Sequence, residues 1–434
     1  MTEEFLYYVW KQRLYSLPLF TAEGEKVEVI YPGERNPDEG PDFVECRIRR
    51  GTETWAGNLE IHTKTSDWYK HHHDTHPLYR HLILHVVFYN DLEGKEPGDF
   101  PTVELKNHIP EELIFRYQRI LQSKDWIPCA REVQTIPPIV WHSMFEMALA
   151  RRYERKISEI SRITSLNHNH IAQAFYLVLA KSFGQVVNGH AFELLARSLP
   201  LNILARHSGN LLQVEALLFG QAGMLEGQGD QYFSQLKHEY KFLRGKYNLQ
   251  PVSGSLWKFM RLRPANFPTL RISQFADLIH RSSGLLSKLT ECNHAEEMEN
   301  LLLCRASEYW DSHYRFGEAA KTQPRIAGKD FIRSLIINAV LPFVSLKESL
   351  MEGNRSMEKL EKLLSELPPE NNTVLRGWAK LGILASDAFE SQALIEMKNR
   401  FCNLRKCLNC RIGHHILNKN SHINKEDQDK KGYQ

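Results

Sequence analysis

The stretch that decides the fold of this chain is NPDEGPDFVECRIRRGTETWAGNLEIHTK, residues 36–64. It contains two segments rich in β-branched and aromatic residues, DFVECRIRR at 42–50 and TWAGNLEIHTK at 54–64. Residues of these types are typical of strands. Gly40 and Pro41 favour a turn immediately before the first segment. The stretch therefore predicts two neighbouring strands of one sheet, the first of which begins directly after a fixed turn.

The same stretch carries acidic and basic groups at strand spacing. Because side chains alternate along a strand, Glu60, His62 and Lys64 share one face. If the two strands pair, Asp42 at the start of the first strand converges with Glu60, and we expect their carboxylates to lie within about 6 Å. Two such carboxylates form a site for Mg²⁺ or Mn²⁺. His62 or Lys64 would then orient a water molecule or stabilise a developing oxyanion.

The flanking segments extend this pattern to residues 1–134. Apolar residues at helical spacing predict a helix in 2–15, and further strands are predicted at 26–31, 82–90 and 102–107. The order helix, hairpin strands, crossover, strand, strand predicts an α/β or α+β domain with a mixed sheet.

The remainder of the chain has helical periodicity. The segment TIPPIV, 135–140, is a predicted linker, and residues 135–417 are predicted to form a mainly α-helical domain that ends in a Cys-rich turn. Residues 418–434 are polar and without apolar anchors, so we expect a disordered tail.

Composition sets limits on the class of protein. A length of 434 residues predicts two or three domains, and the 42% hydrophobic and 25% charged fractions are typical of a soluble globular protein. A net charge of +3 is too small to indicate nucleic-acid binding by itself. The N-terminal segment has neither the pattern of a signal peptide nor that of a membrane anchor. Seven cysteines, an odd number, fit a reducing cytoplasm better than a secreted disulfide framework.

At residues 40–64 the chain resembles the PD-(D/E)XK nuclease superfamily. GPDF (40–43) would supply its Asp, and after a gap of seventeen residues EIH (60–62) would supply its Glu-X-Lys, with His62 at the Lys position. The resemblance implies a restriction-endonuclease-like mixed sheet and a metal-dependent nuclease, in which Asp42 and Glu60 bind the cation. Glu4, on the opening helix, matches the place of an accessory acid.

The whole chain also resembles a family of bacterial proteins recorded as a domain of unknown function. The segments that carry this resemblance are GPDF, EIHTKTSDW, LHVV, RLRPANFP and CLNCRIG. This resemblance implies no activity. A non-catalytic nucleic-acid-binding or scaffold protein with a degenerate nuclease core is therefore the alternative to an active nuclease, and the environment of His62 distinguishes the two.

Other histidines lie near the predicted site. His71, His72, His73 and His76 could bind a metal, but adjacent histidines in a polar turn point in different directions, which favours solvated imidazoles. His85, inside a predicted strand, is expected to be a hydrogen-bonded core residue, with a place beneath the site as the alternative.

Two further motifs lie in the helical region. In WKFMRLRPANFPTLRI, 257–272, Arg261, Arg263 and Arg271 accompany aromatic residues, which suits contact with DNA or RNA; ion pairing with acids is the alternative.

The second motif is FCNLRKCLNCRIGHH, 401–415. The spacing of Cys402, Cys407, Cys410 and His414 suits Zn²⁺, and the same residues could hold an iron–sulfur cluster, as in some relatives of the nuclease superfamily. Three reduced thiols in a helical turn are the alternative.

Overall fold

The computed structural model of the chain describes residues 1–92, 97–352 and 355–419, apart from the side chains of 350–356. The predicted disordered tail, from residue 420 onward, lies outside the described residues. The chain divides into two compact units. Unit 1 consists of residues 1–144, 380–383 and the C-terminal segment from 397; unit 2 consists of residues 145–379 and 384–396.

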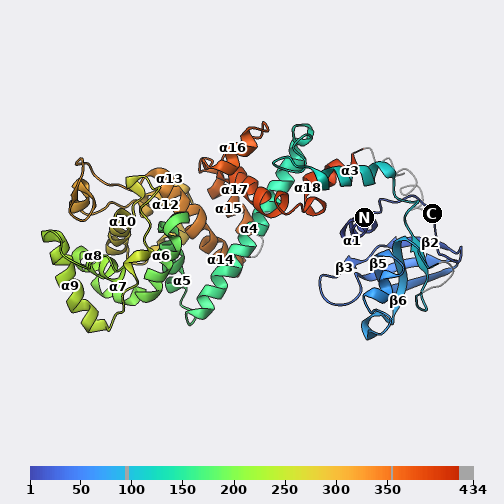
Figure 1. Cartoon of the computed structure of the whole chain (residues 1–434), viewed down its shortest axis with the longest axis horizontal. Helices are drawn as coiled ribbons and strands as arrows, with labels where there is room; N and C mark the ends of the chain where they lie inside the picture. The colour runs from blue at the N-terminus through green and yellow to red at the C-terminus, as the bar shows by residue number, and fades with distance from the viewer. Residues whose placement is uncertain (93–96, 353–354, 420–434) are drawn as a thin grey trace. The chain divides into compact units, whose positions relative to one another are not determined.

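Unit 1 begins with a helix that is followed by a sheet, as Figure 1 shows. Its elements are α1 (Glu3–Lys11), β1 (Leu19–Phe20), β2 (Lys26–Tyr31), β3 (Glu34–Arg35), β4 (Phe43–Arg50), β5 (Glu53–Lys64), α2 (Asp67–Lys70), η1 (Pro77–Tyr79), β6 (Leu82–Tyr89), β7 (Thr102–Glu104), α3 (Glu111–Gln122) and η2 (Val133–Thr135). The predicted mixture of helix and strand, with a mixed sheet, is confirmed.

The sheet has the order β1-β2-β4-β5-β6-β7, with β3 paired to β4. Strands β1 to β5 pair antiparallel, whereas β6 and β7 continue the sheet in parallel. A parallel neighbour requires a crossover connection, and here the crossover from β5 to β6 contains α2 and η1. This crossover carries the histidine-rich turn over one end of the sheet.

Helix α1 packs against β5 through its apolar face, which includes Phe5, Val9 and Trp10, each 0% exposed. The Thr2 side chain accepts the Phe5 N–H and so caps the helix. The indole of Trp10 donates to the carbonyl oxygen of Pro32 at 2.9 Å, which ties the helix to the segment before β4. Burial and capping together fix the rotation of α1, and with it the side chains that face the sheet.

The C-terminal segment of unit 1 contains a π-helical turn η7 (Met397–Cys402), η8 (Cys407–Asn409) and α18 (Arg411–Asn418). Helix α18 packs against α3. The ring of Tyr8 on α1 meets the ring of His414 on α18 edge-on at 4.8 Å, and its hydroxyl donates to Asn418. The Cys-rich motif is therefore part of the same compact unit as the sheet.

Unit 2 is mainly helical, as predicted for this region. After α4 (Pro138–Leu166), which begins inside the predicted linker, its elements are α5 (Ile171–Phe183), α6 (Gln185–Ser198), α7 (Leu201–His207), α8 (Leu211–Gln221), α9 (Gln231–Tyr247), α10 (Pro268–Arg281), α11 (Leu285–Glu291), α12 (Ala295–Leu302), β8 (His313–Arg315), β9 (Glu318–Ala319), α13 (Lys329–Leu335), α14 (Leu341–Glu352), α15 (Arg355–Ser365), α16 (Thr373–Ala379) and α17 (Ala388–Glu396). In the described ranges, no helix combines the length and apolar character needed to cross a membrane.

Candidate metal centre on the mixed sheet

Two buried acids lie where β4 begins beside β5. The Asp42 backbone N–H donates to Glu60 Oε2 at 2.9 Å, and the Ile61 N–H donates to Asp42 Oδ2 at 3.0 Å. Each carboxylate thus accepts from a backbone amide beside the other acid. The structure brings Asp42 and Glu60 together, as the strand pattern predicts, and both are less than a tenth exposed.

Burial is the main cause of the raised pKa of both carboxyl groups. It raises the pKa of Glu60 well above its usual range, and the nearby charge of Asp42 adds to the effect. Burial also raises the pKa of Asp42, although the Ile61 N–H, the Arg35 guanidinium 3.1 Å away and a hydrogen bond from Tyr7 oppose the rise. Two buried carboxylates that are this costly to ionise together favour a cation between or beside them.

His62 is 1% exposed and lies next to Glu60 on the inner side of the site. Its Nδ1 is 2.9 Å from His85 Nε2, its Nε2 is 3.1 Å from His71 Nδ1, and the same Nε2 is 3.7 Å from Glu60 Oε1. Burial lowers the pKa of His62 to about 2 and that of His85 to about 3, so both imidazoles are neutral at physiological pH.

The contact between His62 and His85 determines what His62 can bind. One of the two nitrogens must donate its proton to the other. If His62 Nδ1 donates, the lone pair of His62 Nε2 points toward His71 and Glu60. His85 is fully buried, and its Nδ1 has no hydrogen-bond partner among the described residues. His85 is thus placed beneath the site as an orienting residue for His62.

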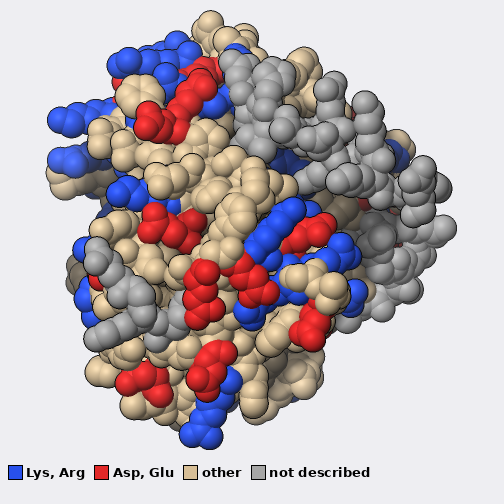
Figure 2. Space-filling view, turned by 90° about the vertical axis from the view of Figure 1, so that its right-hand side faces the viewer, with Lys and Arg blue, Asp and Glu red and all other residues tan. Residues whose placement is uncertain are grey.

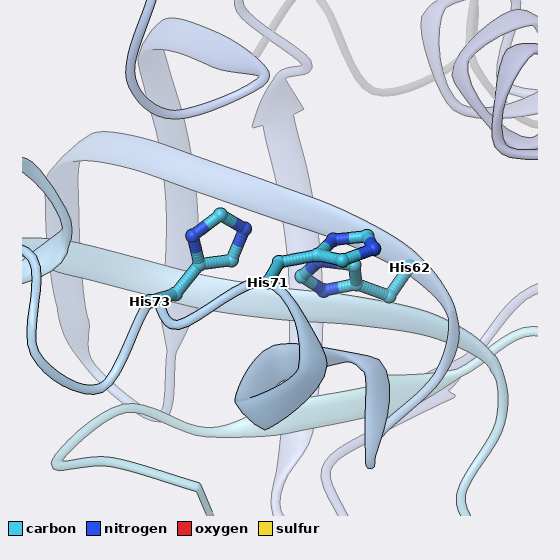
Figure 3. Close-up of side chains that lie close together, drawn as sticks. All are labelled: His62, His71 and His73. Atoms are coloured by element: carbon cyan, nitrogen blue, oxygen red, sulfur yellow. The ribbon is translucent and has the colours of Figure 1, made fainter.

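The turn after α2 brings two more histidines to the same place. Asp67 anchors this turn by accepting from Thr63 Oγ1 at 2.8 Å and from the Lys64 N–H at 3.0 Å. His72 has a φ of 58°, a left-handed conformation that reverses the chain between its neighbours. Figure 3 shows the rings of His71 and His73 beside that of His62. One ligand atom of each of the three histidines lies within 4.8 Å of those of the other two.

Several distances between donor atoms are close to those of a shared ion. His73 Nε2 is 3.2 Å from Glu60 Oε1, and the contacts of His62 Nε2 with His71 and Glu60 span 3.1 to 3.7 Å. Ligands about 2.1 Å from a tetrahedral zinc or similar ion lie roughly 3.4 Å apart. Glu60, His62, His71 and His73 therefore fit a divalent cation, with Asp42 adjoining.

The predicted site residues Lys64 and Glu4 are exposed, whereas Glu3 on α1 interacts with the group. Lys64 is exposed, and its charge acts on Asp91. Glu3, one residue before the acid expected on the opening helix, interacts electrostatically with Asp42, His71 and His73, and burial raises its pKa. Tyr7, one turn further on, bonds to Asp42. The face of α1 that meets the site thus carries Glu3 and Tyr7, whereas Glu4 is exposed.

The three arginines predicted to contact nucleic acid lie in unit 2 and have different environments. Arg261 and Arg263 are exposed. Arg271 is buried, donates to Gln274 and Asn266 at 2.9 and 2.6 Å, and stacks its guanidinium 3.4 Å from the Phe331 ring centre. Ion pairing with an acid was the alternative to nucleic-acid contact, and Arg271 forms no such ion pair among the described residues. Arg271 instead lines a cavity of about 600 Å³ within unit 2.

Cys402, Cys407 and Cys410 converge as their spacing predicts, around a small cavity. Cys129 lines the same cavity. His414, the expected fourth ligand, directs its Nε2 to the Leu408 carbonyl oxygen at 2.6 Å.

Sequence reasoning considered His71 and His73 as metal ligands but favoured solvated imidazoles, and it missed Glu3 and Cys129. The alternation in His71-x-His73 was a usable signal, because two residues separated by one can point the same way when the residue between them reverses the chain. Glu3 and Cys129 are isolated in sequence, and only the packing of α1 and of the loop after α3 brings them to their sites.

Comparison with known proteins gives one match. A family model described as "Protein of unknown function (DUF2851)" matches residues 3–373. No curated protein and no solved structure matches the chain.

Proposed function

The chain belongs to the DUF2851 family, and we propose that unit 1 is a restriction-endonuclease-like domain that hydrolyses phosphodiester bonds of nucleic acid with a divalent cation. The observation that carries the proposal is the convergence of Asp42, Glu60 and three imidazoles at the start of β4 and the middle of β5. Two further features support it, namely the order of the sheet and the electrostatics of the acids.

The topology agrees with the resemblance at residues 40–64. Helix α1 comes first, β2, β4 and β5 pair antiparallel, and β6 follows in parallel after a crossover. A helix followed by a mixed sheet, with Asp42 immediately before β4 and Glu60 on β5, supports the fold that the PD-(D/E)XK resemblance implies. Fold alone does not establish activity, so the proposal depends on the chemistry of the site.

The residues that would hold the cation are Glu60, His62, His71 and His73, with Asp42 beside them. Imidazole donors suit Mn²⁺ or Zn²⁺, whereas Mg²⁺ prefers an all-oxygen set. Mn²⁺ is therefore the member of the expected pair, Mg²⁺ or Mn²⁺, that this donor set favours. When bound, such a cation acts as a Lewis acid toward a phosphoryl oxygen and lowers the pKa of water.

The exposure of each side chain indicates which role it can have in the proposed reaction. His62, enclosed by His85 and His71, suits holding and orienting a ligand rather than meeting solvent. His71 is exposed, so it would hold the cation from the solvent side of the site, where water can enter. Lys64, the other group predicted to assist the water, is exposed.

Nucleic acid would be held by local basic groups around the site. Arg35, with a side chain 42% exposed, and Lys70, 63% exposed, pair with Asp42 and Asp67 at the rim, where both can also meet a phosphate. On the face in Figure 2, basic and acidic residues are interspersed over the centre. The two cations at the rim of the site favour positioning by a few phosphate contacts over binding to a broad basic surface.

Cleavage of labelled single- and double-stranded DNA and RNA by the full chain, with Mn²⁺, Zn²⁺ or Mg²⁺, tests the proposal. We expect metal-dependent cleavage that is strongest with Mn²⁺ or Zn²⁺, and a loss of at least 100-fold in the His73→Ala variant. His76→Ala is the matched control, because His76 lies in the same turn but pairs with Glu39.

Absence of cleavage with every metal and substrate would overturn the proposal. If the same protein nevertheless bound nucleic acid, the alternative of a non-catalytic binding protein with a degenerate nuclease core would replace it.

A further inference from the structure

We propose that Cys129, Cys402, Cys407 and Cys410 together bind one zinc ion through four thiolates. This centre is separate from the acid and histidine site, and it does not depend on the nuclease proposal. The sequence motif supplies three of the cysteines, and the structure supplies the fourth from a loop more than 270 residues earlier.

The four thiols surround one cavity in unit 1. The cavity has a volume of about 20 Å³, and its other walls include the apolar side chains of Ile120, Pro128 and Phe401. Cys407 and Cys410 are buried, and none of the seven cysteines, all of which are in the described ranges, forms a disulfide. Four reduced sulfurs in an apolar enclosure that can take one ion-sized occupant are the donor set of a structural thiolate site.

Electrostatic interactions confirm that the thiols are mutual neighbours. Cys129 interacts with Cys407 and Cys410, and Cys402 interacts with the other three. Grouping four thiols around one small cavity gives no advantage to stability by itself, whereas a bound metal takes the thiolates as ligands and holds them together.

The backbone around the cavity is held in a defined shape. Arg405 has a φ of 52°, and its side chain donates to the Ser123 carbonyl oxygen at 2.7 Å, which ties the motif to the end of α3. A Cβ on Gly413 would lie 2.0 Å from the Cys407 carbonyl oxygen, so only glycine permits this close approach. The cysteine loop and the first turn of α18 are thus preorganised around the sulfurs.

Basic side chains adjoin the sulfurs, as a negatively charged thiolate centre requires. Lys398 acts electrostatically on Cys402, and its ammonium donates to the Trp126 carbonyl oxygen at 2.9 Å. Arg405 acts in the same way on Cys407. These cations would offset the charge of four thiolates and one divalent ion.

The choice of Cys129 over His414 follows from the direction of the side chains. His414 uses its Nε2 for a backbone carbonyl and packs edge-on against Tyr8, away from the residues that line the cavity. The carbonyl oxygen of Cys129 accepts from the Glu132 and Val133 amides. The turn formed in this way holds the Cys129 thiol at the cavity. The centre would therefore join the loop after α3 to α18, on which α1 rests through Tyr8.

Metal content of the full chain, purified without chelators, tests the centre. We expect about one thiolate-bound zinc per chain. The Cys129→Ser variant should lose at least nine-tenths of this metal. His414→Ala and Cys46→Ser should keep it, because Cys46 is buried in β4 and bonds to the Pro32 carbonyl oxygen. Less than a tenth of an equivalent in the wild type, or full metal content in Cys129→Ser, would overturn the proposal.

A second measurement avoids variants that fail to fold. Metal-free wild-type protein is titrated with Co²⁺, whose thiolate charge-transfer absorption grows with the number of sulfur ligands. Cobalt at the acid and histidine site lacks this absorption, so the two sites are distinguished. We expect the intensity of four thiolates, and an intensity of three or fewer would contradict the assignment of Cys129.

Discussion

Replacing Glu60 by Gln should make the metal-free protein more stable and the metal-bound protein less so. Glu60 is 5% exposed, accepts the Asp42 N–H and adjoins the Asp42 carboxylate. Gln keeps the shape and an acceptor for that N–H but carries no charge. The substitution therefore removes the cost of a buried anion, and it also removes the carboxylate oxygen that lies 3.2 Å from His73.

The pH limits how much the Glu60→Gln substitution can raise the free energy of unfolding of the metal-free protein. Burial raises the folded-state pKa of Glu60 above its ordinary value of 4.5, so the folded chain binds a proton there more tightly than the unfolded chain. The stability contributed by Glu60 is complete below pH 4.5 and is lost as the pH rises. At pH 7.5, three units above that value, the cost cannot exceed about 4 kcal/mol. Imperfect hydrogen bonding of Gln leaves a net gain of about 1–3 kcal/mol.

The assay is urea unfolding of chelator-treated full-length protein at pH 5.0 and 7.5, with and without Mn²⁺. We expect the advantage of Glu60→Gln at pH 7.5 to shrink toward pH 5.0. Mn²⁺ at about 100 times its dissociation constant should stabilise the wild type by about 2.7 kcal/mol and the variant much less. Glu53→Gln is the control, since Glu53 is exposed on the same strand, and its effect should stay within about 0.5 kcal/mol. A metal-free Glu60→Gln variant that is less stable than the wild type at pH 7.5, or that gains equally from Mn²⁺, would refute the reasoning.

Three further predictions concern other parts of the chain. Burial lowers the pKa of Lys156 to about 7, so wild-type stability should rise between pH 7 and 9 by up to about 1.4 kcal/mol per pH unit relative to Lys156→Met, as urea unfolding at each pH would show. Gly413→Ala should destabilise unit 1 by about 1–3 kcal/mol because its Cβ would meet the Cys407 carbonyl oxygen; an unchanged melting temperature would contradict this. If the chain binds nucleic acid through unit 2, Arg261→Ala combined with Arg263→Ala should flatten the salt dependence of binding by about two units of slope, and an unaltered slope would reject the contact.

Strand periodicity was sufficient to predict much of the sheet. The segment 26–31 is β2 as predicted, and β4, β5 and β6 differ from their predicted bounds by a residue at an end. Alternation also placed Glu60 and His62 on one side, because a buried face must repeat every two residues. Helical spacing also predicted the mainly helical character of the chain after residue 135, of which α5 (Ile171–Phe183) is an example.

Spacing did not predict the contacts made by turns. His71 and His73 reach the site only because Asp67 anchors the chain and His72 adopts a left-handed conformation. Neither the hydrogen bonds of Asp67 nor the left-handed conformation of His72 produces a periodic pattern in the sequence. Local composition was also insufficient for Arg271. An arginine among aromatic residues suggested contact with nucleic acid, but its guanidinium packs on Phe331 inside unit 2. The chemistry of a residue was readable, but its exposure depended on packing between distant segments.

The most direct test of the central claim is anomalous diffraction from crystals of the full chain grown with Mn²⁺. The account predicts a manganese peak about 2.0–2.3 Å from Glu60 Oε1 and from nitrogen atoms of His62, His71 and His73, with His62 Nδ1 still paired to His85. No peak at this position, or a peak bound by other side chains while His62 and His71 remain bonded to each other, would contradict it.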